Sequence, residues 1–191
     1  MKSLLLLFVT VIGCSAGEMI KVVDADFKRL DGEHAAKLAE LRPKIDLSKA
    51  EDRDFLERVE QQFYADAMME VSGPYFRGTR LKAGDDWRAL WKARQAEALA
   101  DAASDREFRE ALEAAFVLLQ RFEDGRDVRI LERVVKAKFG GEPALILLVH
   151  WEREESVEKD ISSGKEAEIG HFLLIGVRCS DRKLVSRVQC G

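Results

Sequence analysis

The sequence predicts an α+β fold, with three to four N-terminal helices packed on a C-terminal four-stranded antiparallel sheet. Up to about residue 125, apolar residues recur at the three- and four-residue spacing of a helix face. Beyond it, runs rich in β-branched residues alternate with turn sequences, which is the pattern of strands. From residue 18 onward the chain has the size of one domain, so we expect a single domain over 18–191, helical over 18–125 and β-rich over 126–191.

The first two helices are expected around residues 27–41 and 55–71, where large apolar residues follow one another at every third or fourth position. Ser48 and Glu51 have the spacing of a capping box ahead of the second helix. The sequence Ser-Gly-Pro at 72–74 is a strong helix breaker, so we expect the second helix to end there.

Two further helices are expected before residue 125. Asp85 or Asp86 is placed to cap the third helix, because a short side-chain oxygen at that position accepts a free backbone N–H. Ser104 and Glu107 form another capping box at the start of the fourth helix, and Gly125 suits the position just after its end.

The first two strands are expected at residues 128–138 and 144–152. The first of these segments can also be read as a helix, because Leu131, Val135 and Lys138 share helical spacing. We favour a strand, because the turn sequence Gly-Gly-Glu-Pro at 140–143 joins it to the continuously apolar segment that follows.

The last two strands are expected at residues 169–179 and 184–189, with the turn sequence Ser-Asp-Arg-Lys at 180–183 between them. A polar stretch at 154–165 connects the second strand to the third. The four strands then form an antiparallel meander, and the helices cover one of its faces.

The composition is that of an ordinary soluble globular domain, with 47% hydrophobic and 35% charged residues. The formal net charge is -4. A mildly acidic protein has no electrostatic reason to bind nucleic acid or anionic headgroups, so we expect no nucleic-acid partner.

The N-terminus has the pattern of a secretory signal. Lys2 supplies a positive charge, and the apolar run at 4–12 is too short to span a bilayer, which needs roughly 20 apolar residues. The run leads into the sequence Val11-Ile12-Gly13-Cys14, which closely resembles the lipobox of bacterial lipoproteins. An ordinary secretory signal that contains a cysteine by chance is the alternative.

The resemblance implies removal of residues 1–13 as a signal peptide and attachment of lipid to Cys14, with 14–17 left as a short tether. It also implies that the domain is exported to the cell envelope and sits close to a membrane surface. Ser15 follows the cysteine where an Asp would signal inner-membrane retention, which implies the outer membrane in an organism with two. An envelope protein is a further expected partner.

Two of the three histidines lie in expected strands. If the connection between these strands is symmetric about residues 160 and 161, His150 and His171 fall directly opposite each other, and Glu152 points to the same side as His150. Two imidazoles and a carboxylate can hold a zinc ion with an open position. A hydrogen-bonded or stacked pair that contributes only packing is the alternative, and no cofactor is otherwise indicated.

Two cysteines remain after Cys14. In an oxidising compartment Cys179 and Cys190 are candidates for a disulfide. A tight turn at Asp181 and Arg182 would instead pair Cys190 with a residue about 20 Å from Cys179, so the sequence supports either the bond or the tight hairpin.

Two functions of different class remain open. The first is a non-catalytic envelope lipoprotein that binds a ligand or partner, or assists assembly at the membrane. The second is a small membrane-tethered hydrolase or metal-dependent enzyme that uses the sheet around His150 and His171. We favour the first, because the sequence contains no specific catalytic motif.

Overall fold

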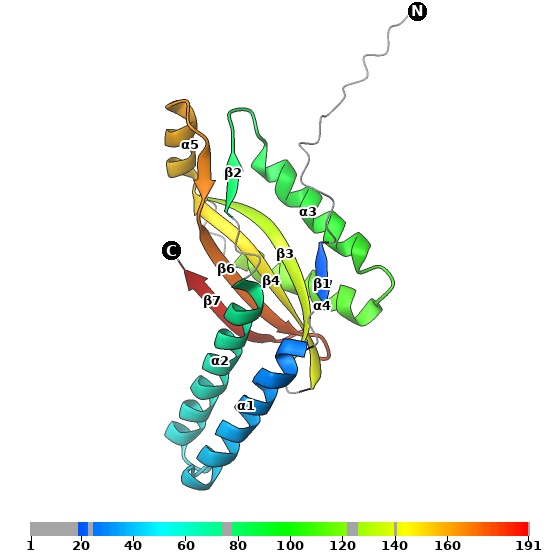
Figure 1. The fold of residues 1–191 in the computed structure, drawn as a ribbon, viewed down its shortest axis with the longest axis vertical. Helices are drawn as coiled ribbons and strands as arrows, with labels where there is room; N and C mark the ends of the chain where they lie inside the picture. The colour runs from blue at the N-terminus through cyan, green and yellow to red at the C-terminus, as the bar shows by residue number, and fades with distance from the viewer. Residues whose placement is uncertain (1–18, 23–24, 74–77, 122–125, 140, 191) are drawn as a thin grey trace, which may run out of the picture.

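The computed structural model describes residues 19–22, 25–73, 78–121, 126–139 and 141–190. It has an α+β fold, built on a five-stranded sheet of order β1-β3-β4-β6-β7 and a separate two-stranded sheet, β2-β5 (Figure 1). The elements are β1 (Ile20–Val22), α1 (Ala25–Leu41), η1 (Arg42–Lys44), α2 (Ala50–Ser72), β2 (Thr79–Leu81), α3 (Trp87–Asp101), α4 (Arg106–Arg121), β3 (Asp127–Phe139), β4 (Glu142–Arg153), α5 (Glu154–Ser162), β5 (Ala167–Ile169), β6 (His171–Arg178) and β7 (Leu184–Cys190).

The fold class is confirmed, but two details of the prediction are wrong. The main sheet is mixed, because β1 pairs in parallel with β3, and Ile20 lies opposite Val134. The described residues also contain five α-helices instead of three or four, since α5 follows β4 within the β-rich half. α5 has only nine residues, and its apolar side consists of Val157 and Ile161. So short a periodic pattern cannot be told from a polar loop in the sequence.

β3 and β4 form the long hairpin at the centre of the sheet. Residues 127–139 are a strand, so the strand reading of 128–138 is confirmed and the helical one is excluded. Phe139 pairs with Glu142 across a two-residue turn, in which Gly141 has a φ of 82° that only glycine adopts readily.

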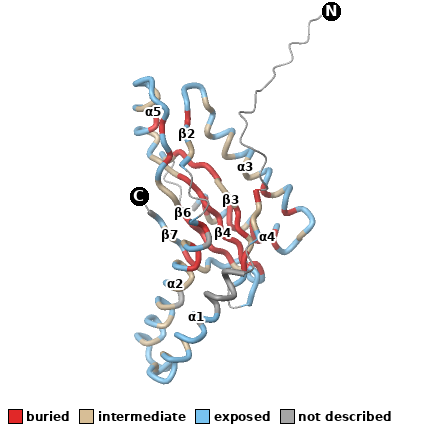
Figure 2. Tube along the Cα trace, in the orientation of Figure 1, coloured by how far each residue is buried: buried red, intermediate tan, exposed pale blue. Residues whose placement is uncertain are grey.

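Helices cover both faces of the main sheet, whereas the sequence predicted one. Alternate residues of β4 point to opposite faces: Leu147 packs in a cluster with Leu112 of α4, and Ile146 packs in a second cluster with Met68 of α2. The central strands are accordingly buried along most of their length (Figure 2). α2 approaches β6 so closely that a Cβ on Gly176 would lie 2.5 Å from the Met68 sulfur. A continuously apolar strand such as β4 is what a sheet covered on both faces requires.

α3 lies against the first half of β3. β1 pairs only with the middle of β3, so the early residues of β3 form an edge of the sheet. Trp91 of α3 packs on the cluster beneath α4, whereas Trp87 packs on a third cluster that contains Ile130 of β3 and Ile169 of β5. α3 therefore borders the part of the sheet that lies beyond the C-terminal end of α4.

The helix starts differ in part from the sequence prediction. Asp86 caps α3, accepting from the Ala89 amide at 3.0 Å, as predicted for one of two candidates. The two expected capping boxes do not form: Ser48 donates to Asp46 instead, and Asp105 accepts the Phe108 amide at the start of α4. Gly125 and the lipobox, with Cys14, the signal peptide 1–13 and the tether 14–17, lie outside the described residues.

The chain enters the described domain at a fixed point. The Met19 side chain is 1% exposed, its amide donates to Asp101 Oδ2 at 3.1 Å, and its carbonyl accepts from the Val134 amide at 3.1 Å. By contrast, α1 and α2 form a hairpin that projects beyond the sheet (Figure 1). Among the helices that the structure describes, none has the length and apolar character needed to cross a bilayer.

Candidate functional site

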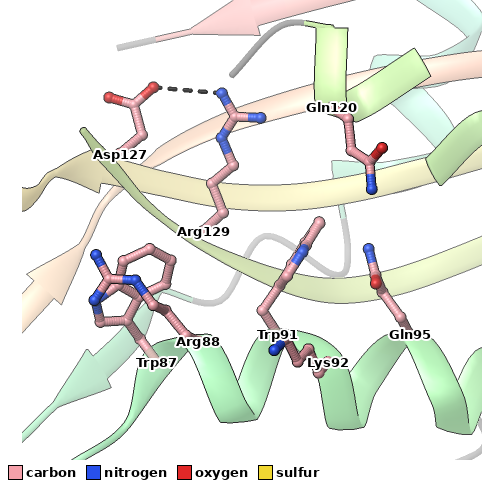
Figure 3. A pocket seen from close by; sticks show the side chains of 8 residues that line it. All are labelled: Trp87, Arg88, Trp91, Lys92, Gln95, Gln120, Asp127 and Arg129. Carbon is pink, nitrogen blue, oxygen red and sulfur yellow. Dashed lines mark hydrogen bonds and ion pairs between the residues drawn. The ribbon is translucent and has the colours of Figure 1, made fainter. Parts of the chain in front are cut away.

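α4 covers only part of the sheet face on which it lies. Beyond its C-terminal end, a pocket of about 360 Å³ lies between α3, α4 and β3 (Figure 3), and we call it the open pocket. Its lining consists of Trp87, Arg88, Trp91, Lys92 and Gln95 of α3, Gln120 of α4, and Asp127 and Arg129 of β3. The lining therefore combines flat aromatic walls with charged and amide groups, as ligand sites in proteins do.

Arg129 is the most buried charged residue of the open pocket, at 6% exposed. Its Nη1 donates to the Leu119 carbonyl at 3.2 Å, so the guanidinium satisfies a backbone acceptor in the last turn of α4. Its Nη2 lies 3.4 Å from Asp127 Oδ2. These contacts fix the orientation of the side chain in advance of any ligand.

A smaller recess of about 180 Å³ adjoins the open pocket and shares Asp127 and Arg129 with it. Its lining consists of Asp127, Arg129, Val149, Trp151, Arg153, Leu173, Arg187 and Gln189. Arg153 Nη1 lies 3.4 Å from Asp127 Oδ1, so the guanidinium groups of Arg129 and Arg153 approach the two oxygens of one carboxylate. All three tryptophans of the chain thus line the open pocket or this recess.

The α3 side of the open pocket carries a stacked cation. The Arg88 guanidinium lies over the Trp87 ring, 4.1 Å from its centroid, and its Nη2 is 2.8 Å from Glu154 Oε1. Figure 3 shows Gln95 and Gln120 extending toward each other from α3 and α4. Amide groups at that place can donate to, or accept from, a polar ligand atom.

The predicted opposition of His150 and His171 is wrong by one residue. β4 and β6 pair so that Trp151 lies opposite His171, and His150 lies opposite Phe172. Because successive side chains of a strand point to opposite faces, this shift puts the two imidazoles on opposite faces of the sheet. The prediction assumed a symmetric connection, whereas α5 and β5 interrupt the chain between the two strands.

His171 pairs with Glu152 at the end of the sheet. His171 Nδ1 lies 3.1 Å from Glu152 Oε2, and the His171 ring lies 4.9 Å from the Trp151 ring, tilted by 34°. A carboxylate beside one ring nitrogen orients an imidazole. This pair is the part of the predicted His150, His171 and Glu152 site that the structure brings together.

The structure does not assemble these residues into a metal site. Within the described residues, no three His, Cys, Asp or Glu side chains are grouped so that they could hold a metal ion. His150 is 2% exposed, and neither of its ring nitrogens has a hydrogen-bond partner in the described part of the chain. Burial lowers its pKa, although the Glu132 carboxylate and the Ile169 backbone act in the opposite direction, so the neutral form of the ring is favoured.

The two late cysteines lie at opposite ends of the β6–β7 hairpin. Cys179 is a buried free thiol just after β6, whereas Cys190 pairs with Phe172 at the start of that strand. Seven residues of strand span about 23 Å, well beyond the ~7 Å between Cα atoms that a disulfide allows. The connection is also longer than the tight turn predicted at Asp181 and Arg182, because residues 179–183 all lie outside the strands.

The sequence reading missed the open pocket. Arg129 carried no distinguishing signal, because it is one of five charged residues in the predicted strand at 128–138. Trp87 and Trp91 belong to the third predicted helix, but helical spacing does not show where a neighbouring helix ends.

No known protein family, no characterised protein and no solved structure matches this chain.

Proposed function

We propose that this chain is a lipoprotein anchored to an envelope membrane through Cys14, and that its domain is a non-catalytic binding module. The open pocket is its ligand site. The observation that carries the binding role is a concave, aromatic and charged space at the end of α4, with Arg129 held in place by the Leu119 carbonyl and Asp127. A fixed cation beside flat apolar walls suits recognition of a ligand without requiring chemistry on it.

The proposed anchor rests on the sequence Val11-Ile12-Gly13-Cys14. Two or three acyl chains, each contributing about 0.8 kcal/mol per buried CH₂, hold a soluble domain stably at a membrane. The outer membrane is the proposed location in an organism with two membranes, because Ser15 is not the inner-membrane retention residue.

The anchor is tested by feeding cells an alkyne-tagged fatty acid and comparing wild type with Cys14→Ser and Cys190→Ser. We expect tagged protein in the wild type and in Cys190→Ser, where the lipobox is intact, and no tag in Cys14→Ser. A tag that persists in Cys14→Ser, or its absence from the wild type, would contradict the proposal.

A second candidate is an enzyme that uses Glu152 and His171. The 3.1 Å approach of the carboxylate to His171 Nδ1 is the observation that favours it, because it orients an imidazole as a general base. Hydrolysis of a panel of chromogenic esters, phosphates and glycosides separates the two candidates. Turnover that disappears in His171→Gln but persists in His150→Gln would favour the enzyme over the binding module.

A further inference from the structure

We infer that the open pocket binds a neutral carbohydrate, with the face of one sugar ring against Trp91 and its hydroxyl groups beside Gln95 and Gln120. This inference rests on the proposed binding function and adds the chemical class of the ligand. Three properties of the pocket lead to it: the pairing of its charged groups, the amides on two of its walls, and the flat surface of Trp91.

Most charged groups in the lining of the open pocket already have partners within the protein. Arg129 donates to the Leu119 carbonyl and lies 3.4 Å from Asp127, and Arg88 pairs with a glutamate of α5 at 2.8 Å. The remaining charged residue of the lining, Lys92, is exposed, so water and salt screen its charge. A charged ligand would compete with the existing pairs, and breaking a buried pair costs free energy. The lining therefore favours a ligand without net charge.

The amide groups of Gln95 and Gln120 are available to a ligand. In the described part of the chain, neither side chain has a hydrogen-bond partner. They extend toward each other from α3 and α4, so they belong to two different walls of the pocket (Figure 3). Each amide has donors and an acceptor, and a hydroxyl group likewise both donates and accepts. A ligand with hydroxyl groups on two edges can therefore satisfy both amides at once.

Trp91 supplies a flat surface within the same pocket. It precedes Gln95 by about one turn of α3, and its ring extends from the helix toward the sheet (Figure 3). The face of a sugar ring presents polarised C–H bonds, which the negative face of an aromatic ring attracts. A ring that is apolar on its face and polar around its rim thus matches a tryptophan beside two amides. The volume of about 360 Å³ falls in the range of small-molecule sites.

The test titrates the intact lipidated protein with three neutral trisaccharides: cellotriose, maltotriose and triacetylchitotriose. A polyoxyethylene detergent keeps the protein in solution, because its head group contains no sugar. Tryptophan fluorescence is the readout, because every tryptophan of the chain lines the open pocket or the adjoining recess. We expect a saturable response to at least one of the three, and an affinity that changes less than about twofold between low and high salt.

A substitution at the pocket wall locates the binding. Gln120 is exposed at the end of α4, so Gln120→Ala removes one amide from the lining with little effect on folding. We expect it to weaken binding of the responsive trisaccharide about three- to tenfold, as the loss of a hydrogen bond does. The same substitution at the exposed Gln61 of α2 is the control and should leave the affinity unchanged.

Benzamide, a flat neutral molecule without hydroxyl groups, separates this inference from the function on which it rests. A saturable response to benzamide with none to the trisaccharides would overturn the carbohydrate assignment and leave a binding pocket. Equal affinities of Gln61→Ala and Gln120→Ala for the responsive trisaccharide would also overturn it, because the sugar would then bind elsewhere. No saturable response to any of the four probes would overturn the assignment together with the proposed binding role of this pocket.

Discussion

At one end of the main sheet, the two faces each bury a polar side chain, and they do so in different ways. Arg129 of β3 lies on the face that carries α4, in the part that α4 leaves uncovered, where the Leu119 carbonyl and Asp127 accept its hydrogen bonds. His150 of β4 lies on the other face, opposite Ile130 and Phe172, and neither of its nitrogens has a partner in the described part of the chain.

The difference shows why burial of a polar group does not by itself indicate a site. Burying a polar side chain costs free energy unless its hydrogen bonds are replaced. Arg129 meets that requirement with a backbone carbonyl and a carboxylate, and its surroundings still leave space for a ligand. His150 has no such partner in the described part of the chain, and its neutral ring avoids only the larger cost of burying a charge, so we assign it to the core and not to binding.

Removing the Arg129 cation beside the open pocket should have the largest effect on stability. Arg129→Met leaves Asp127 with one fewer cation and the Leu119 carbonyl without its donor, so we expect a loss of about 3 kcal/mol in the free energy of unfolding. For a domain of this size, that loss lowers the melting temperature by roughly 6–12 °C, measurable by circular dichroism. Arg58→Met, at an exposed position of α2, is the control and should change stability by no more than about 0.5 kcal/mol. Equal effects of the two substitutions would break the comparison.

His150, on the opposite face of the sheet from Arg129, should make the stability of the domain depend on pH. The folded-state pKa of His150 is lowered, so on acidification the unfolded chain takes up the proton first, and stability falls as the pH drops below about 6.5. In His150→Leu this part of the pH dependence should disappear, whereas at neutral pH the variant should be as stable as wild type or slightly more stable. Urea unfolding at several pH values measures both effects, and an unchanged acid slope would show that His150 is not the group responsible.

A third, smaller effect concerns Cys179, in the part of the sheet that α4 covers. Cys179 belongs to the cluster beneath α4, where burial, with the Glu107 carboxylate acting in the same direction, raises its pKa to about 11. Its thiol should therefore react slowly with a maleimide in the native protein and rapidly in denaturant, as mass spectrometry of the labelled peptide will show. Stability should also decline as the pH rises from about 9 toward 11, because the unfolded thiol ionises first. Fast native labelling of Cys179 would mean that α4 does not seal this end.

The sequence was sufficient for the long elements, where local pattern and tertiary packing agree. The continuous apolar run of β4 and the glycine turn before it established the central hairpin, and Asp86 was correctly one of two caps proposed for α3. Short elements were missed, because three-residue strands such as β1 and β2 carry no periodicity. The covering of the second face by α2 was missed as well, although a strand that is apolar on both sides is the sequence signature of that arrangement.

Sites depend on register and on where neighbouring elements end, and neither follows from local pattern. A register shift of one residue puts His150 and His171 on opposite faces of the sheet. The shift arises because α5 lies in the connection that the prediction treated as symmetric. The open pocket exists because α4 ends before the sheet does, which places Gln120 beside Arg129. Neither relation is visible in the residues themselves.

The fixed position of Met19 has a geometric consequence for the proposed lipid anchor. Five residue steps join Cys14 to Met19, and they can extend no farther than about 18 Å. Met19 is bound to Asp101 at one end of α3, and Trp91 lies ten residues back along that helix, which corresponds to about 15 Å. With a lipid on Cys14, the mouth of the open pocket would therefore stay within roughly 35 Å of the bilayer, so its search for ligand would be confined to a thin layer of solvent along the membrane.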